Sequence, residues 1–437
     1  MTEFLITSEA RAVFADVWRR PVMHFVRAAA FIGILLLVWI SLHPFDDLSD
    51  MRVGEVTSGK EAVLYALFGL LMVLMLVLTM RDNMPALASL LTPAYVLFGV
   101  WLCLTVVLSF DPATSSRRFA LSVFVVVVTA TVMLLPKSQS ELMRWFSIAA
   151  LVLLATCYLG ILLAPNLSIH LATDPQEPAL AGNWRGAFGH KNVAAAIMAM
   201  MMFFGVYFIR AGGWISGVIV MALSALFLVY SAGKSSISLC LAVLLLTSLT
   251  SFVRSLWGRG LMLLLPLIVL NLFSVGTVLS DTLASIAKLL PLDTSFTGRS
   301  DIWVFAVDSL HQRLLTGYGF EAFWGSNAIT NLKEGKEWAG YASHSHNGYL
   351  DTALGTGLPG LVFLIAAVVV KPLRDFQAAD EGGNDGPLSM MFLRIWLFGL
   401  YLSSMESFFL DRADPIWATF LIALFGLHYL ARFRLRA

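Results

Sequence analysis

Charged residues are scarce in this chain. Asp, Glu, Lys and Arg together make up 13% of the 437 residues, whereas hydrophobic residues make up 58%. Mean hydropathy is correspondingly high, at +0.80. This shortage of charge excludes an ordinary soluble domain and indicates a protein that crosses a membrane many times. The net charge of +1 also gives no reason to expect a nucleic-acid partner.

Cysteine is nearly absent as well. The three residues of this type, Cys103, Cys157 and Cys240, all fall inside apolar runs, where a thiol behaves as a small hydrophobic group. Neither a disulfide framework nor a zinc-binding spacing can be built from them. We therefore expect no structural metal, and no motif in the chain calls for a cofactor.

The apolar runs do not alternate with polar residues, which excludes a membrane β-barrel. They are close to the roughly 20 residues that a helix needs to cross a bilayer, and only helices satisfy every backbone group within their own segment in lipid. The sequence thus predicts an all-α integral membrane protein with about twelve transmembrane helices. The expected spans are 28–42, 62–80, 87–109, 119–135, 145–163, 193–209, 213–230, 236–252, 261–279, 352–370, 390–408 and 416–430.

One long polar interval, 281–351, separates the ninth and tenth of these spans. Elsewhere the chain has no linker that would divide it, so we interpret residues 1–437 as a single membrane domain with one inserted loop. Within the interval, 281–290 and 301–315 each place apolar residues on one helical face. We expect two short helices there, lying over the surface of the membrane.

Basic residues near the ends of the spans predict the orientation. Lys and Arg are more frequent on the side that holds both chain termini, for example at Arg144, Arg210 and Arg254. By the positive-inside rule that side is the cytoplasm. The loop 281–351 is then external, and periplasmic if the host is Gram-negative. The segment before the first span is too long and polar for a cleavable signal peptide, so we expect the first span to direct insertion.

Several basic residues lie on the external side, against this trend. Arg185 and Lys191 flank a Gly-containing turn, Lys234 begins a span, and Arg299 begins a predicted helix. Guanidinium and ammonium groups, together with the free N–H groups of a helix start, bind phosphate oxygens. These four residues are our candidate contacts for a lipid-linked diphosphate. The alternative is that each one binds lipid headgroups or a nearby carboxylate.

The end of the loop carries the sequence Ser-His-Ser-His-Asn immediately before the tenth span. A neutral imidazole can accept the proton of an attacking hydroxyl, and a neighbouring Asn or Asp can hold the required tautomer. We therefore predict His346 as the general base, with His344 as the second choice. Two histidines at this spacing without a third ligand are a weak metal signal. A further alternative is that these side chains only cap the following helix.

Glu406 is the third candidate catalytic residue, within the eleventh predicted span. A carboxyl group inside a span is costly and is by default a functional hypothesis. It can orient a catalytic histidine, hold an arginine or bind an acceptor hydroxyl. A buried ion pair with Arg412 or Arg118 is the structural alternative.

Four segments together carry a resemblance to a known family: 183–192, 297–303, 316–320 and 344–350. In order and position they resemble the successive blocks of the O-antigen ligase and O-antigen polymerase superfamily. The resemblance extends over roughly 183–406. The run 317–325 is most similar to the ExoQ-like exopolysaccharide polymerases of that superfamily.

This resemblance implies a metal-independent glycosyltransferase of the bacterial inner membrane, with both termini in the cytoplasm. Its donor would be a glycan carried on undecaprenyl diphosphate. External arginines hold the diphosphate in such enzymes, which assigns that role to Arg185 and Arg299. A loop histidine assists the acceptor hydroxyl, which assigns that role to His346. Relatives usually have arginine at the position of Lys234, and lysine lacks the bidentate fork.

Three functions remain possible: two enzymatic ones, polymerase and ligase, and one that is not enzymatic, transport. In a polymerase the acceptor is another lipid-linked repeat and a chain-length regulator is an expected partner, whereas in a ligase the acceptor is the lipid A core. A transporter of the major facilitator type would also have twelve spans and both ends inside. That architecture has its long loop in the cytoplasm between two halves, whereas here only residues 210–212 join spans six and seven.

Overall fold

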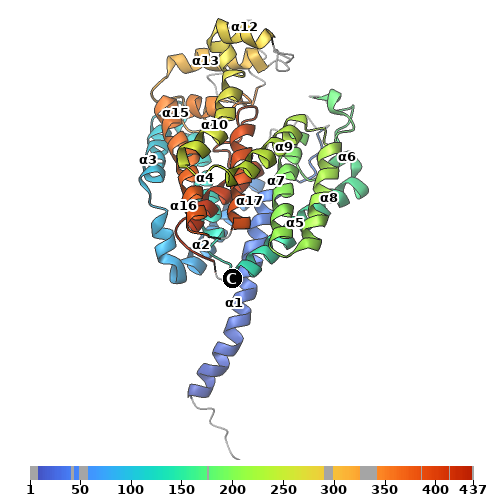
Figure 1. The fold of residues 1–437 in the computed structure, drawn as a ribbon, viewed down its shortest axis with the longest axis vertical. Coiled ribbons are helices and arrows are strands. Elements are labelled where there is room, and N and C mark those ends of the chain that lie inside the picture. The colour runs from blue at the N-terminus through green and yellow to red at the C-terminus, as the bar shows by residue number, and fades with distance from the viewer. Residues whose placement is uncertain are drawn as a thin grey trace, which may run out of the picture.

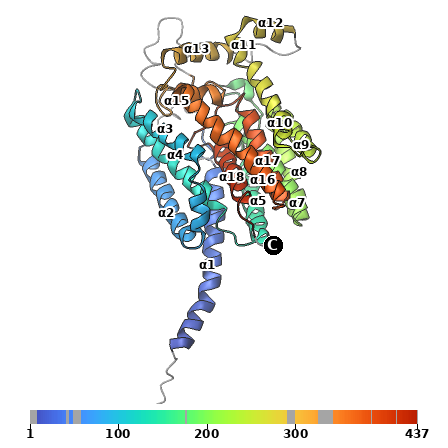
Figure 2. The same cartoon turned by 60° about the vertical axis from the view of Figure 1, so that its left-hand side comes forward.

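A computed structural model describes residues 8–40, 44–48, 58–174, 177–289, 299–324, 342–384, 386–412 and 414–435. The regular structure of these residues is helical, and their one pairing of extended backbone is an isolated bridge between Ile169 and Trp184. Long apolar helices form a bundle (Figure 1). Helices α12 and α13 lie across one end of this bundle (Figure 2).

The helices follow the apolar runs of the sequence closely. Those of the bundle are α1 (Ser8–Trp39), α2 (Ser58–Ser89), α3 (Pro93–Val107), α4 (Pro112–Val132), α5 (Gln139–Leu163), α7 (Lys191–Arg210), α8 (Trp214–Tyr230), α9 (Lys234–Ser248), α10 (Leu256–Leu272), α15 (Gly348–Leu364), α16 (Lys371–Glu381), α17 (Gly386–Leu402) and α18 (Pro415–Leu430). The shorter helices are α6 (Pro165–Ser168), α11 (Gly276–Leu279), α12 (Asp281–Leu289) and α13 (Arg299–Gln312). A π-helical stretch, Ile365–Val370, joins α15 to α16.

An all-helical membrane protein is confirmed. In the described residues, 6 helices are long and apolar enough to cross a membrane, or 7 if the bent helix α2 is one span. The apolar helices α3, α8, α10, α17 and α18 are shorter than this length. Every predicted span overlaps a helix, but the number of about twelve crossings stays a prediction.

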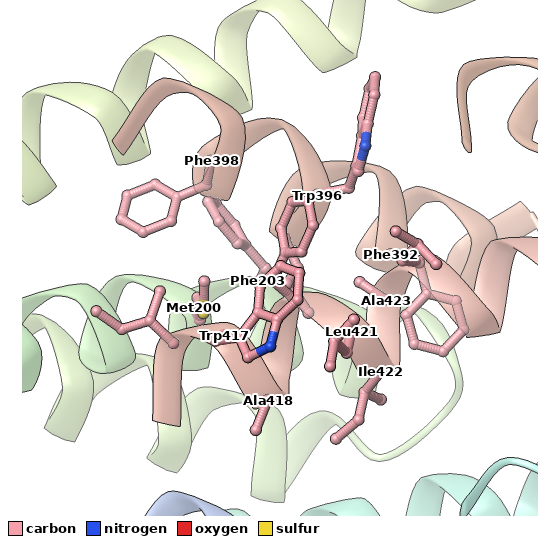
Figure 3. Close-up of a cluster of buried hydrophobic side chains, with 14 of the residues drawn as sticks. Met200, Phe203, Phe392, Trp396, Phe398, Trp417, Ala418, Leu421, Ile422 and Ala423 are labelled. Atoms are coloured by element: carbon pink, nitrogen blue, oxygen red, sulfur yellow. The ribbon is translucent and has the colours of Figure 1, made fainter. Parts of the chain in front are cut away.

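The core of the bundle lies where α7, α17 and α18 meet. Helix α7 is the most enclosed of the candidate spans, with 72% of its apolar window buried. The ring of Phe203 on α7 lies 5.9 Å from that of Phe398 on α17, and Figure 3 shows both side chains together with Trp417 and Leu421 of α18. Lipid tails are as apolar as these side chains, so close packing rather than the hydrophobic effect holds such helices together.

Glycines let α7 and α8 approach each other closely. A Cβ atom added at Gly217 would lie 2.7 Å from the backbone oxygen of Gly205. Small residues at such crossings allow two helix backbones to come into contact in a membrane. The α7–α8 hairpin is therefore closely packed, and the candidate site includes the first turn of α7.

The two helices predicted within the long loop are present, and they differ in burial. Helix α13 buries Trp303, Ala306 and Leu310 against α15, as the sequence predicts. Helix α12 leaves Ile286 and Leu289 exposed. Ala287 of the same helix is buried, so only part of its apolar surface is uncovered. Exposed apolar side chains of this kind are expected on a helix that rests on a lipid surface.

The backbone that follows α13 is hydrogen-bonded to α15. We call the contacts between residues 314–319 and residues 354–358 the clasp. The N–H group of Tyr318 donates to the carbonyl of Leu354 at 2.8 Å, and that of Leu358 donates to Leu314 at 2.8 Å. Helix α15 is irregular there because Gly357 has a φ of 72°. Gly317 has a φ of 64°, and a Cβ on it would lie 2.5 Å from the oxygen of Leu354. The clasp therefore helps to fix the position of α13 over the end of the bundle.

We predict that Gly317→Ala lowers the free energy of unfolding for two reasons, the unfavourable positive φ and the steric contact of the new Cβ with the backbone of α15. The left-handed conformation costs alanine about 1–2 kcal/mol, and overpacking against backbone adds about 1–3 kcal/mol. Gly212→Ala is the matched control, because Gly212 has a φ of 94° and open space around its Cβ position. Thermal unfolding in detergent should show the larger loss for Gly317→Ala. Equal losses for the two variants would contradict the clasp.

Candidate active site

The segment that carries both candidate histidines is held to the start of α15 by buried polar groups. Asn347 caps the helix, and its Oδ1 accepts hydrogen bonds from the N–H groups of Tyr349 and Leu350 at 3.1 and 3.0 Å. The N–H group of Ser345 donates to the Asp351 carboxylate at 3.0 and 3.2 Å. The capping function considered from the sequence therefore belongs to Asn347, which leaves the imidazoles available for other contacts.

Residues from three other elements hold the same segment. Trp303 of α13 donates from its indole Nε1 to the carbonyl of Ser345 at 2.8 Å. The Asn347 Nδ2 group donates to Asn271 Oδ1 of α10 and to the carbonyl of Ser404, which follows α17, at 3.2 Å each. The histidine segment is thus positioned jointly by α10, α13 and the end of α17.

His346 adopts an uncommon backbone conformation that directs its side chain toward Glu406. Its φ is 56°, which non-glycine residues rarely adopt. Its Nδ1 lies 3.2 Å from Glu406 Oε2, and the two side chains are 29% and 20% exposed. Residues at such φ values concentrate at functional sites because the surroundings must compensate for the strain. The pair is accessible from solvent while remaining well anchored.

Glu406 also binds Arg299 and Asn192. The Arg299 Nη2 group lies 3.0 Å from Glu406 Oε1, and its Nη1 donates to the carbonyl of Met405. Asn192, in the first turn of α7, donates from Nδ2 to the same Oε1 at 3.1 Å. One carboxylate therefore joins residues from α7, α13 and the segment before α15.

The contacts of Glu406 determine its ionisation. Burial raises its pKa, but the hydrogen bond from His346 and the positive charge of Arg299 lower it more, so that the pKa falls to about 2. An ionised carboxylate only accepts hydrogen bonds, so Nδ1 of His346 must carry the proton in this pair. In the neutral imidazole, Nε2 is then left with a free lone pair. That is the protonation state a general base requires.

His344 supports His346 and faces a different set of neighbours. Its ring contacts that of His346 at a centroid distance of 4.1 Å and an angle of 72°. Its Nδ1 accepts the backbone N–H of His346 at 3.3 Å. Burial, followed by the proximity of His346, lowers the pKa of His344. Among the described residues, no carboxylate is hydrogen-bonded to the ring of His344 as Glu406 is to that of His346, so the geometry favours His346 as the candidate base.

Lys191 and Lys234 form a second basic group beside this cluster. Lys191 is the first residue of α7, and its backbone neighbour Asn192 binds Glu406. The Lys191 ammonium interacts electrostatically with Lys234 and with Glu177. His190 caps α7 through Nδ1 and pairs with Glu177 through Nε2 at 2.8 Å. Two predicted anion contacts therefore lie near each other at the starts of α7 and α9.

Arg185 is placed differently from the other predicted anion contacts. Its side chain is 1% exposed, and its Nη1 donates to the carbonyl of Phe188 at 3.2 Å while its Nη2 donates to that of Asp46. The guanidinium thus connects the residue 185–190 turn to the segment 44–48. In this conformation it is not presented to a ligand, and none of its contacts joins it to Arg299. Residues 297 and 298, which precede Arg299, lie outside the described residues.

Two expectations about Glu406 are corrected. Helix α17 ends at Leu402, so Glu406 lies in the following loop rather than inside a span. Its partners are not Arg412 or Arg118, because these contact Glu321 instead, the former at 3.0 Å. Burial, with Asp411, raises the pKa of Glu321 to about 8 against the effect of both arginines. The two carboxyl groups therefore have separate sets of cations.

A largely apolar cavity of about 400 Å³ lies between α2, α3, α4 and α18. Its lining includes Phe320 and Leu410, and Leu410 is four residues after Glu406. Tyr95 and Leu87 line it as well. The cavity thus contacts both the loop that follows the candidate site and helices of the membrane domain, and it has the character of a site for hydrocarbon.

Some residues of this site were not singled out in the sequence. Asn192, Trp303, Asp351 and Asn271 all hold the cluster. Asn192 and Asn271 gave a usable signal, because each is a polar residue at the start of an apolar run or inside one. Trp303 was predicted only as part of the buried face of its helix. Among the described residues, no group of three or more His, Cys, Asp or Glu side chains is placed to hold a metal ion.

We predict that Glu406 contributes stability that disappears in acid. Its folded-state pKa of about 2 lies below the ordinary glutamate value of roughly 4.3. The contribution is therefore complete above that ordinary value and is lost as the pH falls toward the folded-state pKa. Thermal unfolding midpoints should fall more steeply for the wild type than for Glu406→Gln over this range.

Glu381→Gln, which removes an exposed carboxyl from the end of α16, is the control for that experiment. It should keep the wild-type slope. If Glu406→Gln also keeps the wild-type slope, the carboxylate does not hold the cluster together.

Part of the chain matches a known family. Residues 218–365 match the family model described as O-Antigen ligase. The matched region contains Lys234, Arg299, His344 and His346, whereas Lys191 and Glu406 lie outside it. No curated protein matches the chain.

Proposed function

This chain belongs to the O-antigen ligase superfamily by the match of residues 218–365, and we propose that it polymerises lipid-linked oligosaccharide repeats. Membership supports a membrane role in glycosyl transfer for polysaccharide synthesis. The finer proposal is a donor glycan on undecaprenyl diphosphate, used at the periplasmic face of the bacterial inner membrane. We also propose that the chain crosses the membrane about twelve times, with both termini in the cytoplasm and with the loop 281–351 in the periplasm.

The observation that supports this proposal best is the bridging of Arg299 and His346 by Glu406. A cation for the diphosphate and a base for the acceptor lie on the two oxygens of one carboxylate. Glycosyl transfer needs these two groups close together, because the nucleophile attacks the same carbon that the diphosphate leaves. Lys191 and Lys234 add positive charge nearby, whereas Arg185 in its buried position supports the scaffold.

The proposed reaction is a single displacement. Nε2 of His346 accepts the proton of the acceptor hydroxyl, whose oxygen forms a bond to the anomeric carbon of the donor. The bond between that carbon and the diphosphate oxygen breaks, and undecaprenyl diphosphate leaves with its charge stabilised by Arg299 and the two lysines. These cations replace a metal ion in the proposal. Inversion at the anomeric carbon follows, and an unchanged anomeric configuration in the product would exclude it.

The lipid part of the donor requires an apolar site next to these charges. The cavity lined by Phe320 and Leu410 meets that requirement, since its volume is about 400 Å³ and its lining is almost entirely apolar. We propose that a portion of the isoprenoid chain occupies it.

The proposal of a polymerase rests on the similarity of residues 317–325 to ExoQ-like proteins, with a chain-length regulator as an expected partner. A ligase that transfers polymer to the lipid A core is the alternative.

We predict that His346→Gln abolishes polymer formation. Loss of a general base typically costs 10²- to 10⁴-fold in rate, so single repeats should accumulate on the lipid in a complemented deletion strain. His311→Gln is the matched control, because His311 is an exposed histidine of α13. Glycan size distributions distinguish the readings: polymer that persists on the lipid but fails to reach lipid A would indicate a ligase. Unchanged polymer in His346→Gln would contradict both the polymerase and the ligase proposals.

We also predict that the reaction needs no metal ion. Purified wild-type protein should therefore remain active in EDTA.

We predict that Arg299→Lys retains part of the activity that Arg299→Ala loses. Lysine keeps the charge but cannot reach Glu406 and the Met405 carbonyl with a planar fork. Donor titrations with purified protein should show the larger increase in KM for Arg299→Ala. Arg313→Ala, which removes an arginine just after the same helix, is the control. An Arg299→Ala variant with the wild-type KM and kcat would exclude the diphosphate role.

A further inference from the structure

A second imidazole–carboxylate pair lies beside the one formed by His346 and Glu406. His190, the last residue before α7, places its Nε2 2.8 Å from Glu177 Oε2. The chain between α5 and α7 carries both residues, and it reaches the end of the bundle that also carries α12 and α13 (Figure 1). The proposed displacement at the anomeric carbon gives this second pair no role.

Asn192 connects the two pairs. Its backbone N–H group donates to Nδ1 of His190 at 3.1 Å, and its side-chain Nδ2 group donates to Oε1 of Glu406 at 3.1 Å. The other oxygen of Glu406 contacts His346. A continuous series of contacts therefore runs from Glu177 to the candidate base through the first turn of α7.

Glu177 is ionised and can accept further hydrogen bonds. The hydrogen bond from His190 lowers its pKa, and the nearby imidazoles of His170 and His346 act in the same direction, against the effect of burial. An ionised carboxylate offers about four acceptor positions on its two oxygens, of which His190 occupies one. The Glu177 side chain is 53% exposed, so the remaining positions can be reached from solvent.

A buried histidine helps to set the position of this carboxylate. His170 is 1% exposed, and its ring contacts that of His190 at a centroid distance of 5.3 Å. Its Nδ1 lies 3.3 Å from Asp174 Oδ2, and its Nε2 accepts the backbone N–H of Lys191 at 3.3 Å. Burial lowers the pKa of His170, in keeping with a neutral ring that accepts at Nε2. The residues before α7 are thus fixed to its first turn at two points.

The charges around Glu177 indicate which ligand it receives. Arg299, Lys191 and Lys234 supply the positive charge that a diphosphate requires, whereas a carboxylate repels that group. Sugar hydroxyls are uncharged and donate hydrogen bonds to carboxylates, and such charge-assisted bonds are stronger than those between neutral groups. Glu177 interacts electrostatically with His346, the base proposed for the acceptor hydroxyl. Its ligand is therefore the acceptor sugar rather than the donor diphosphate.

We propose that Glu177 binds hydroxyl groups of the acceptor sugar, with His190 as the positioning residue that holds it. This inference rests on the proposed function and adds a substrate class to it. The acceptor is a sugar without negative charge near the attacking hydroxyl, because Glu177 would repel a carboxylate or sulfate group there. Asn192 couples this subsite to Glu406, so the same turn of α7 supports both acceptor binding and the orientation of His346.

The test is the kinetics of glycan transfer by the purified full chain. The lipid-linked repeat is the donor, and the same oligosaccharide, released from its lipid by mild acid, is a soluble acceptor. Glu177→Gln should raise the KM for the soluble acceptor about tenfold, because hydrogen bonds to a charged group become bonds to a neutral one. The kcat and the KM for the donor should stay within about twofold of wild type. Glu177→Asp, which keeps the charge, should retain part of the affinity.

Asp308→Asn is the control, because it removes an exposed carboxylate from α13 at the same end of the bundle. It should keep the wild-type constants. If Glu177→Gln leaves the acceptor KM unchanged, or changes only kcat or the donor KM, the inference is overturned while the proposed function stands. Wild-type protein that extends the lipid-linked repeat but not the soluble one also overturns it, because recognition would not depend on the sugar. No transfer at all by the wild type would contradict the proposed function as well.

Discussion

The site depends on the carboxylate of Glu406, which binds three side chains that are distant in sequence. Removing a carboxylate from water is costly unless hydrogen bonds and opposite charges compensate. Arg299, His346 and Asn192 provide this compensation, and each approaches from a different element. Because the carboxylate stays ionised, it determines the tautomer of His346 and the position of Arg299 at the same time. The loop between α13 and α15 is therefore connected to α7 through one residue.

The remainder of the fold serves to bring these segments to one end of the bundle. The glycine contact between α7 and α8 and the clasp at Gly317 allow close backbone approaches that larger residues would prevent. Buried Asn347 and Trp303 then hold the histidine segment, Asn347 by donating to the carbonyl of Ser404 and Trp303 by donating to that of Ser345. Such preorganisation reduces the reorganisation that a reaction requires, because the charged groups are already in place when the substrate arrives. The apolar cavity beside Leu410 adds a place for hydrocarbon close to these groups.

Local patterns in the sequence predicted the helices and the buried face of α13 because periodicity depends on neighbouring residues. They predicted the end of α17 incorrectly, since the apolar residues after Leu402 are buried in a loop and hydropathy does not distinguish that from a span. Arg185 and Arg299 have the same chemistry and similar glycine-containing surroundings. Only tertiary structure shows that Arg185 binds backbone carbonyls in the interior. For Glu406 the sequence predicted a catalytic histidine or an arginine as possible partners, and the structure shows both, in His346 and Arg299. The sequence alone could not choose between these and Arg412 or Arg118, because each contact spans a long stretch of chain.

The most direct test of this account is a double-mutant cycle on glycan transfer by purified protein, using His346→Gln, Glu406→Gln and the combination. Residues that act as a unit have effects that do not add. If Glu406 acts by positioning His346, the combined loss in kcat should be much smaller than the product of the two single losses. A combined loss equal to that product would mean that the two residues act independently, and it would contradict the central role given to their contact.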